Sequence, residues 1–279
     1  MEMPLSATIR RDATASDSPP MNPRPAGISE AEWRTRIDLA AFYRIVAIYG
    51  FDDFMYTHIT ARIPGAEEHI LINPFGLMFE EITASSLVKL DLDGNILSDS
   101  EFDINYAGYV IHSAIHSMRQ DAKWIAHFHT RDGVGVSAHA DGLLPLTQRS
   151  VYFGPLLAYH DYEGVALNLE ERTRLQFDLG DKSLMILRNH GTLALGSTPG
   201  STWTSIYQLE KACAEQVTAL AGGREHVLLA PEAAQAEARR LLDRSPPLNG
   251  EKEIYRCHDT LVWEAVLRKV RRALPGHDT

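Results

Sequence analysis

The chain has 279 residues, of which 44% are apolar and 23% are charged, so it can bury a sizeable hydrophobic core. Its formal net charge of -10, without a long run of Lys or Arg, argues against a nucleic acid or a membrane surface as partner and favours a small molecule or a protein. The two cysteines, Cys213 and Cys257, both fall in segments with helical periodicity, which excludes a disulfide framework and a thiolate metal cluster. The polar N-terminal segment and the lack of an apolar run of about 18 residues predict a cytoplasmic protein without a membrane span.

The ends of the chain differ in composition from the middle. Residues 1–27 are rich in proline and small polar residues and predict a disordered arm. Ser29 and Glu32 form a capping-box pattern that begins a helix, and Gly50 ends it. We therefore expect one domain over residues 28–245, followed over residues 246–279 by a linker and a last helix around residues 259–271. That helix would pack on its own or on a neighbouring subunit.

Between these limits, strand and helix patterns alternate. The apolar periodicity predicts strands at residues 58–62, 69–72, 88–92, 124–129, 183–187 and 192–195. It also predicts a helical turn at residues 83–86, a hairpin turn at residues 93–94, and helices at residues 105–118 and 203–220. The fold class expected from this order is α/β, with a mixed central sheet flanked by helices.

A pair of histidines stands out in one of the predicted strands. His127 and His129 are two residues apart, so the period of a strand places both imidazoles on one face. His190 follows another apolar strand and precedes Gly191, which permits a tight turn. Three neutral imidazoles with open coordination positions suit Zn²⁺, and also Fe²⁺, Co²⁺ or Mn²⁺. Packed or hydrogen-bonded histidines are the alternative interpretation of the same spacing.

Several ordered motifs resemble those of the class II aldolase and adducin family, in particular its adducin-head branch. The motifs lie at residues 57–60, 71–76, 83–89, 105–115, 124–130, 142–145 and 188–191. The resemblance spans roughly residues 30–222 and implies the three-layer, class II aldolase-like fold. It also implies that His127, His129 and His190 hold one divalent metal ion per subunit. Finally, it implies a ring-shaped homotetramer with sites between subunits, to which His258 of the last helix could contribute.

The chain departs from the sugar-phosphate aldolases of this family at one segment. Those enzymes have Ser-Ser-Glu at the start of the helix before the metal strand, and the matching positions here are Tyr106, Ala107 and Gly108. The two phosphate-binding hydroxyls and the proton-transferring carboxylate are therefore missing. We expect an unphosphorylated substrate and a different proton-transfer group.

Other residues are candidates for these roles. The candidates for proton transfer, each of which could instead be a core or surface residue, are His112, His116, Tyr159 and His160, with Tyr152 and Tyr162 as further phenols. The candidates for substrate binding are His58, Asn73, Asn105 and Arg188. Asn105 could instead cap its helix, and Arg188 could form a structural ion pair.

Three functions remain open from the sequence. The first is a metal-dependent lyase that cleaves or forms a carbon–carbon bond beside a carbonyl in a 2-oxo or 2-hydroxy acid, as an aldolase or decarboxylase. The second is a non-haem Fe(II) oxygenase, because the resemblance also covers enzymes that oxidatively decarboxylate an aromatic 2-oxo acid. The third is a non-catalytic, adducin-like assembly module, against which the complete histidine set argues.

Overall fold

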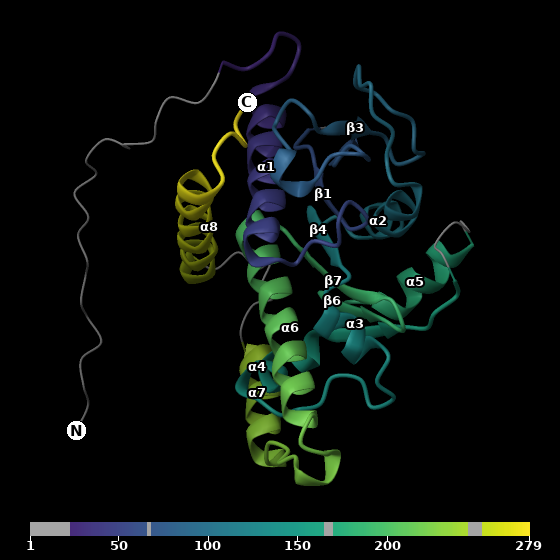
Figure 1. Ribbon diagram of the computed structural model, residues 1–279, viewed down its shortest axis with the longest axis vertical. Helices are drawn as coiled ribbons and strands as arrows, with labels where there is room; N and C mark the ends of the chain where they lie inside the picture. Colours follow the sequence, from purple (N-terminus) through teal and green to yellow (C-terminus); the bar gives the residue numbers. More distant parts are fainter. Residues whose placement is uncertain (1–22, 66–67, 165–169, 245–252) are drawn as a thin grey trace, which may run out of the picture.

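The computed structural model describes residues 23–65, 68–164, 170–244 and 253–279. Residues 1–22 of the predicted arm and the linker residues 245–252 lie outside the described part of the chain. The central sheet has seven strands in the order β3-β2-β1-β4-β7-β6-β5 (Figure 1). Their bounds are β1 His58–Arg62, β2 Ile70–Ile72, β3 Val88–Leu90, β4 Trp124–Phe128, β5 Leu157–His160, β6 Leu184–Leu187 and β7 Gly191–Gly196. β5 and β6 pair parallel and the other neighbours antiparallel, which confirms the predicted mixed sheet.

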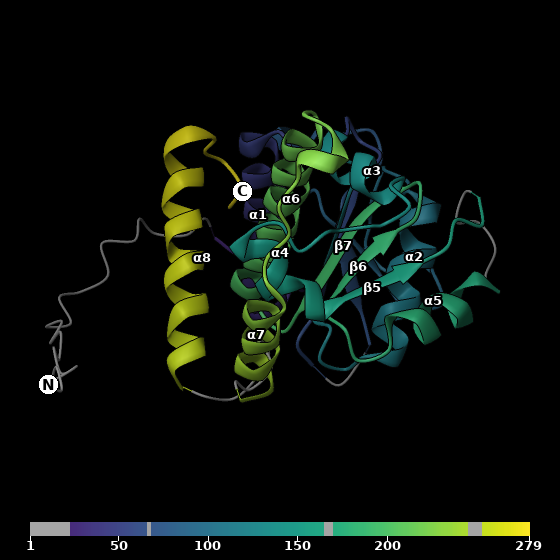
Figure 2. The same ribbon diagram turned by 90° about the horizontal axis from the view of Figure 1, so that it is seen from below.

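Helices cover both faces of this sheet. The α-helices are α1 Glu30–Tyr49, α2 Tyr106–Met118, α3 Arg131–Ser137, α4 Gln148–Phe153, α5 Glu171–Leu179, α6 Pro199–Leu220, α7 Glu232–Arg244 and α8 Glu253–Ala273. Short 3₁₀ turns are η1 Phe79–Glu81, η2 Gly154–Leu156 and η3 Arg224–His226. Figure 2 shows α2 and α5 on one side of the sheet and α1 and α6 on the other, with α8 outside them. The three-layer α/β architecture is thus confirmed, with α8 as an additional outer element.

Two apolar clusters join the layers. One cluster packs α2 and α5 against the sheet through residues such as Ile115, Leu175 and Leu193. The larger one packs α1, α6 and α8 against the opposite face and includes Phe42, Trp203 and Trp263. The strands β4, β6 and β7 are therefore buried on both faces.

Helix α1 begins and ends where its sequence predicts, but its first turn differs from the predicted capping box. The Ser29 hydroxyl accepts from the Glu32 backbone N–H at 3.1 Å, and Gly50 ends the helix at φ 64°. The Glu32 carboxylate does not accept from the Ser29 backbone N–H, as a capping box requires. It instead binds Arg36 at 2.9 Å and Lys89 at 3.0 Å, because two cations offer a buried carboxylate more than one N–H does.

Most predicted strands are present with small shifts at their ends. The prediction for residues 58–62 matches β1, whereas β2 starts one residue later than predicted and β3 ends at Leu90. The predicted helical turn at residues 83–86 is a non-helical turn, in which the Thr83 and Ser86 hydroxyls each accept from the other's backbone N–H. β4 ends at Phe128, so His129 lies just beyond the strand.

The sequence patterns missed β5, α3, α4, α5 and α7. β5 is four residues long and lies at the edge of the sheet, with alternating burial of Leu157, Ala158, Tyr159 and His160. Its pairing with β6 comes from a crossover through α5 rather than from a local turn. Such a short edge strand carries little periodic signal of its own.

The last helix packs on this chain's own α1 and α6. Trp263 donates from its indole N–H to Asp38 of α1 at 2.8 Å. None of the helices in the described part of the chain combines the length and the apolar composition that a membrane crossing requires.

Candidate metal centre

Three histidines lie together at one end of the central strands. His127 belongs to β4, His129 follows its last residue, and His190 stands in the turn between β6 and β7. β4 and β7 pair antiparallel, so the end of one meets the start of the other. The His127 Nε2 atom is 2.8 Å from that of His129 and 3.3 Å from that of His190. One ring nitrogen of each lies within 4.8 Å of the other two. The structure thus brings together the three predicted ligands.

The position of His190 depends on its two neighbours in the turn. Asn189 has φ 55°, a left-handed conformation that asparagine tolerates better than most residues. At Gly191, a Cβ atom would overlap the carbonyl oxygen of Phe128 and lie 3.3 Å from the His127 ring. Glycine therefore lets β7 come close enough to β4 for the third imidazole to join the other two.

Hydrogen bonds to the outer ring nitrogens determine where the protons lie. His127 Nδ1 is 2.9 Å from the carbonyl oxygen of Thr192, and His129 Nδ1 is 3.2 Å from the Asp53 carboxylate. A carbonyl and a carboxylate can only accept, so both Nδ1 atoms carry a proton and both Nε2 atoms carry a lone pair. Two lone pairs 2.8 Å apart repel each other unless a cation lies between them.

The electrostatics of the cluster favour neutral rings. Burial lowers the pKa of His127 well below its ordinary value, and neighbouring imidazoles lower it further. Burial, aided by His129, lowers the pKa of His190 to about 4. The pKa of His129 is also lowered by burial, although Asp53 opposes the shift. At neutral pH the cluster therefore offers three uncharged nitrogen donors, which is a donor set suited to a divalent metal ion.

A pocket of about 300 Å³ opens beside two of these histidines. Its lining includes His129 and His190 together with Tyr56, His58, Asn105 and Ile111. Among the described residues that line it there is no Lys or Arg. A small ligand in this pocket would thus lie next to the imidazole cluster and meet few charges.

The four predicted substrate-binding residues have different places. His58 lines the pocket, while Asn105 caps α2 by accepting from Ala107 N–H at 3.2 Å and donates to the Tyr56 carbonyl. Asn73 is buried away from the pocket lining and accepts from the Tyr43 hydroxyl at 2.8 Å. Arg188 lies with its guanidinium 4.3 Å above the centre of the Tyr159 ring and donates to the His139 carbonyl.

Four of the predicted proton-transfer residues, His112, His116, Tyr159 and His160, lie outside the pocket lining. His112 and His116 are fully buried in α2, and their rings contact the Thr60 hydroxyl. Tyr159 accepts from the Leu143 backbone N–H at 3.0 Å, so its hydroxyl supports a loop. His160 is buried beside Asp178, at 2.7 Å, in a narrow crevice that also borders His190.

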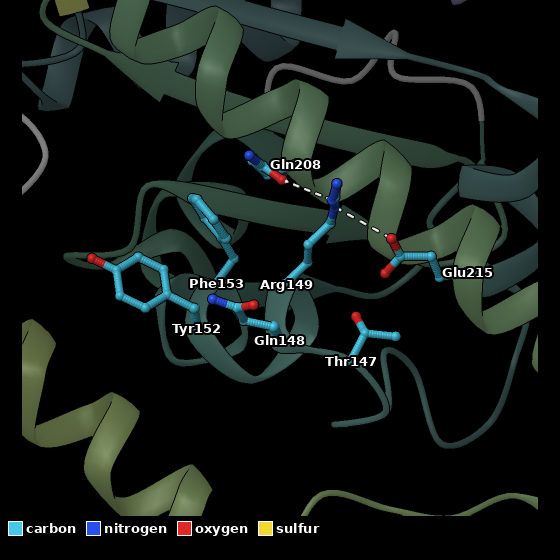
Figure 3. Close-up of a pocket in the computed structure, with 7 residues that line it drawn as sticks. All are labelled: Thr147, Gln148, Arg149, Tyr152, Phe153, Gln208 and Glu215. Atoms are coloured by element: carbon cyan, nitrogen blue, oxygen red, sulfur yellow. Dashed lines mark hydrogen bonds and ion pairs between the residues drawn. The ribbon is translucent and has the colours of Figure 1, made fainter. Parts of the chain in front are cut away.

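A larger hollow, of about 580 Å³, lies between α4 and α6 (Figure 3). Arg149 crosses it, 3.4 Å from the Gln208 side-chain oxygen and 3.3 Å from Glu215. Of the two additional tyrosines that the sequence suggested as phenol donors, Tyr152 lies in this hollow and Tyr162 lines the pocket beside the histidines. No histidine is among the described residues around the hollow, and its cation is already paired, so we place the candidate site at the histidine cluster.

Sequence reasoning missed the residues that support the cluster. Asp53 holds His129, and Glu210 of α6 accepts from the hydroxyls of Thr130 and Thr192. Thr130 follows His129 directly, and Thr192 supplies the carbonyl that holds His127. Nothing local marks Asp53 or Glu210, because each reaches the cluster from a segment far away in the sequence.

The structure is that of an α/β protein with a mixed sheet and three imidazoles that converge at one end of its central strands, a donor set that suits a divalent metal ion. The chain belongs to the family described as "Class II Aldolase and Adducin N-terminal domain", whose profile matches residues 37–217. This match confirms the resemblance seen in the motifs.

Individual relatives agree with this assignment. A class 2 aldolase-type protein from Caulobacter vibrioides is 55% identical over 250 residues, covering 90% of this chain and 94% of that protein. The crystal structure of an aldolase II superfamily protein from Pseudomonas syringae has a TM-score of 0.83 and 45% identity, covering 90% of this chain and 98% of that one. Alpha-adducin from Rattus norvegicus is 44% identical over 210 residues, which cover 73% of this chain but 28% of the adducin.

Proposed function

We propose that the protein is a metal-dependent lyase of the aldolase type, which cleaves or forms a carbon–carbon bond beside a carbonyl group. The observation that carries the proposal is the convergence of three neutral imidazole nitrogens at a pocket of about 300 Å³. Membership in the family and the similarity to class 2 aldolase-type proteins support this class of reaction.

The ligand assignment is part of the proposal. His127, His129 and His190 would hold the ion through Nε2, with Thr192 and Asp53 keeping the first two rings in the right tautomer. Bound there, a divalent cation would act as a Lewis acid on a carbonyl oxygen and stabilise the developing enolate. Ile111 and Ala107 in the pocket wall would limit water around the reacting carbons.

The proposed substrate is an unphosphorylated 2-oxo or 2-hydroxy acid. A phosphate group would need cationic or hydroxyl partners at the start of α2. The two serine positions are taken by Tyr106, which is not among the residues that line the pocket, and by Ala107, which has no hydroxyl, and the described pocket lining contains no Lys or Arg. A substrate with a single carboxylate is small enough for the pocket and could bind the metal ion through its carboxylate and adjacent oxygen atoms.

We also propose one domain over residues 28–245, which contains the family match at 37–217, and a homotetramer. The proposed cytoplasmic location stays a prediction from composition. Light scattering of the purified protein gives the assembly directly: a mass four times the 31.1 kDa of the chain supports the tetramer, and a monomer contradicts it.

The first experiment is elemental analysis of protein purified without chelator or added metal, combined with oxygen uptake in the presence of aromatic and aliphatic 2-oxo acids. Zn²⁺, Mn²⁺ or Co²⁺ at about one ion per subunit, without oxygen uptake, supports the lyase. Iron with substrate-dependent oxygen uptake would instead select the oxygenase. No bound metal would contradict the site and leave the non-catalytic, adducin-like module.

A further inference from the structure

A narrow crevice lies next to the pocket at the histidine cluster. Its volume is about 10 Å³, and His160 is among the residues that line it. The crevice and the pocket share four residues in their linings, so the two spaces are neighbours: Ile111, Tyr162, Gly164 and His190. One water molecule needs a space of roughly 10 to 15 Å³. The crevice therefore has room for a single water molecule beside His160 and the pocket.

The ring of His160 is held from one side by a carboxylate. Its Nδ1 atom is 2.7 Å from the Asp178 carboxylate in α5. A carboxylate can only accept, so Nδ1 carries a proton and a neutral ring has its lone pair on Nε2. The side chain is 4% exposed, and Nε2 has no hydrogen-bond partner among the described residues. His160 thus presents one buried acceptor atom that the described protein does not satisfy.

This acceptor atom lies on the crevice side of the ring, near a second carboxylate. His160 Nε2 is 3.5 Å from a carboxylate oxygen of Glu171, which lines the crevice, whereas Asp178 is not among its described lining residues. Glu171 and Asp178 are seven residues apart in α5, so they lie on one face of the helix. A proton that reaches Nε2 would turn the ring into a cation between two carboxylates, and both stabilise that charge.

Backbone contacts hold His160 next to the turn that carries His190. β5 pairs with β6, and His160 lies opposite Leu187 in this pair. The Arg188 backbone N–H donates to the His160 carbonyl at 2.8 Å. His190 follows Arg188 by two residues and also lines the crevice. The acceptor ring and the candidate metal centre are therefore attached to the same strand, β6.

The other candidate histidines have less suitable surroundings. His112 and His116 are fully buried in α2 and belong to neither lining. His58 lines the pocket, in the space that a Cβ atom at Gly108 would need. Its ring centroid is 5.0 Å from that of His127 and 4.6 Å from that of His112. Neutral imidazoles stabilise an added positive charge less than carboxylates do, so the α5 carboxylates distinguish the ring at the end of β5.

We propose that His160, held by Asp178, is the proton acceptor of the site and receives the proton through one water molecule in the crevice. In the direction of cleavage, the substrate hydroxyl loses its proton, and the O–H electron pair forms the new carbonyl bond. The electron pair of the broken carbon–carbon bond stays on the carbon beside the substrate carbonyl, to which the stored proton returns. The step rests on the proposed lyase function and needs no further reactant. His160 reaches the substrate only through the water molecule, and Asp178 is the positioning residue behind it.

The return of the proton to carbon can be measured in reverse with pyruvate. Zinc-loaded protein that forms the enolate of pyruvate in D₂O exchanges its methyl protons for deuterium, and proton NMR follows the exchange. We expect His160→Ala to exchange roughly 100-fold more slowly than wild type, as for the loss of a proton-transfer group, at unchanged zinc content. Equal exchange rates at equal zinc content would overturn the proposal, and a loss confined to His58→Asn would assign the step to His58.

Rescue and a matched variant separate proton transfer from a structural role. Added imidazole should restore part of the exchange in His160→Ala, relative to wild type with the same imidazole, because it can enter the space left by the ring. Asp178→Asn should slow the exchange roughly tenfold, because an amide no longer fixes the proton on Nδ1. Asp181→Asn is the control, since that side chain is 90% exposed, and an equal loss in both variants would contradict the role of Asp178.

The arrangement of the ring is tested without metal or substrate. Nitrogen NMR of metal-free, ¹⁵N-histidine-labelled protein, with His160 assigned by comparison with His160→Ala, distinguishes the two ring nitrogens. We expect a proton on Nδ1 in wild type and a mixture of tautomers in Asp178→Asn. A wild-type ring protonated only at Nε2 would overturn the proposal even if His160→Ala fails to fold. Zinc-loaded wild type that exchanges no pyruvate protons would instead overturn the proposed lyase function, and the transfer step with it.

Discussion

At the scale of single residues, the outer nitrogens of the histidines are as informative as the inner ones. Thr192 and Asp53 each accept one N–H, and this leaves the lone pairs of His127 and His129 directed at the same point. If the two histidines served only to pack the core, nothing would compensate the repulsion between their Nε2 lone pairs at 2.8 Å. The hydrogen-bond partners thus argue for a cation more strongly than the His-x-His spacing does.

Replacement of His190 by alanine should abolish tight metal binding and leave the fold largely intact, because the ring is only partly buried and its removal leaves two ligands. Elemental analysis and circular dichroism measure the two effects. His226→Ala is the control, since that side chain is 75% exposed in η3. A full metal complement in His190→Ala would remove this residue from the ligand set.

Replacement of Asp53 by asparagine should weaken metal binding by roughly 10- to 100-fold, as is typical when the partner of a ligating histidine is altered. Asparagine can place its amide nitrogen or oxygen toward His129 and no longer carries the charge that favours Nδ1–H. Competition with a chelator of known affinity measures the change. Asp52→Asn is the neighbouring control, and an equal loss in both variants would contradict a specific role for Asp53.

At the scale of elements, α6 links the two segments that carry the three clustered histidines. Its Glu210 is 2% exposed and accepts from Thr130, which caps α3 after His129, and from Thr192 in β7. Burial raises the pKa of Glu210 to about 7, although the two hydroxyls oppose this shift. The carboxyl group therefore joins the ends of β4 and β7. Above neutral pH it is ionised while buried, and this charge lowers the stability of the folded protein.

The Glu210→Gln variant tests this cost. The pKa of the Glu210 carboxyl is about 7 in the folded protein and 4.5, its ordinary value, in the unfolded chain. The protonated carboxyl therefore stabilises the folded protein fully below pH 4.5, and this stabilisation is lost as the pH rises through 7. The difference corresponds to roughly 3 kcal/mol. Urea unfolding at pH 5 to 8, at equal metal content, should show Glu210→Gln gaining stability relative to wild type as the pH rises. A constant difference between the two proteins would contradict the raised pKa.

At the scale of the whole molecule, the C-terminal segment packs on the first helix and on the segment that follows η1. α8 packs on α1 and α6, and beyond it the backbone N–H groups of Ala84 and Ser85 donate to the carbonyls of His277 and Thr279, each at 2.9 Å. Arg44 of α1 donates to the carbonyl of Leu274 at 3.2 Å. The last helix is thus part of the same core as the sheet layers, and Figure 2 shows it alongside α1 and α6.

Truncation of Trp263 to alanine should lower the free energy of unfolding by about 3 to 5 kcal/mol, the usual cost of removing a buried tryptophan. The ring is 8% exposed, packs 5.7 Å from the Phe42 ring and donates to Asp38. Urea unfolding measures the loss. Leu261→Ala, which is 48% exposed on the same helix, should cost much less, and an equal cost would show that α8 is not held through Trp263.

Much of the fold follows from local patterns. The strand at residues 58–62 and the cap at Asn105 depend on neighbours in the chain, and both agree with the structure. The pairing of His127 with His129 is also local, because two residues on one strand share a face. His190 could be added from its glycine-flanked turn and from the family resemblance.

The remaining features depend on contacts between distant segments. The placement of β5 at the sheet edge needs the crossover through α5, and the contact between His58 and His112 needs β1 to lie beside α2. The vacant side-chain position at Gly108 was visible in the sequence as a missing carboxylate, but the imidazole that fills it comes from 50 residues earlier in the chain. Hydrogen-bond partners of this kind leave no periodic signal, because the chain must fold before the two segments meet.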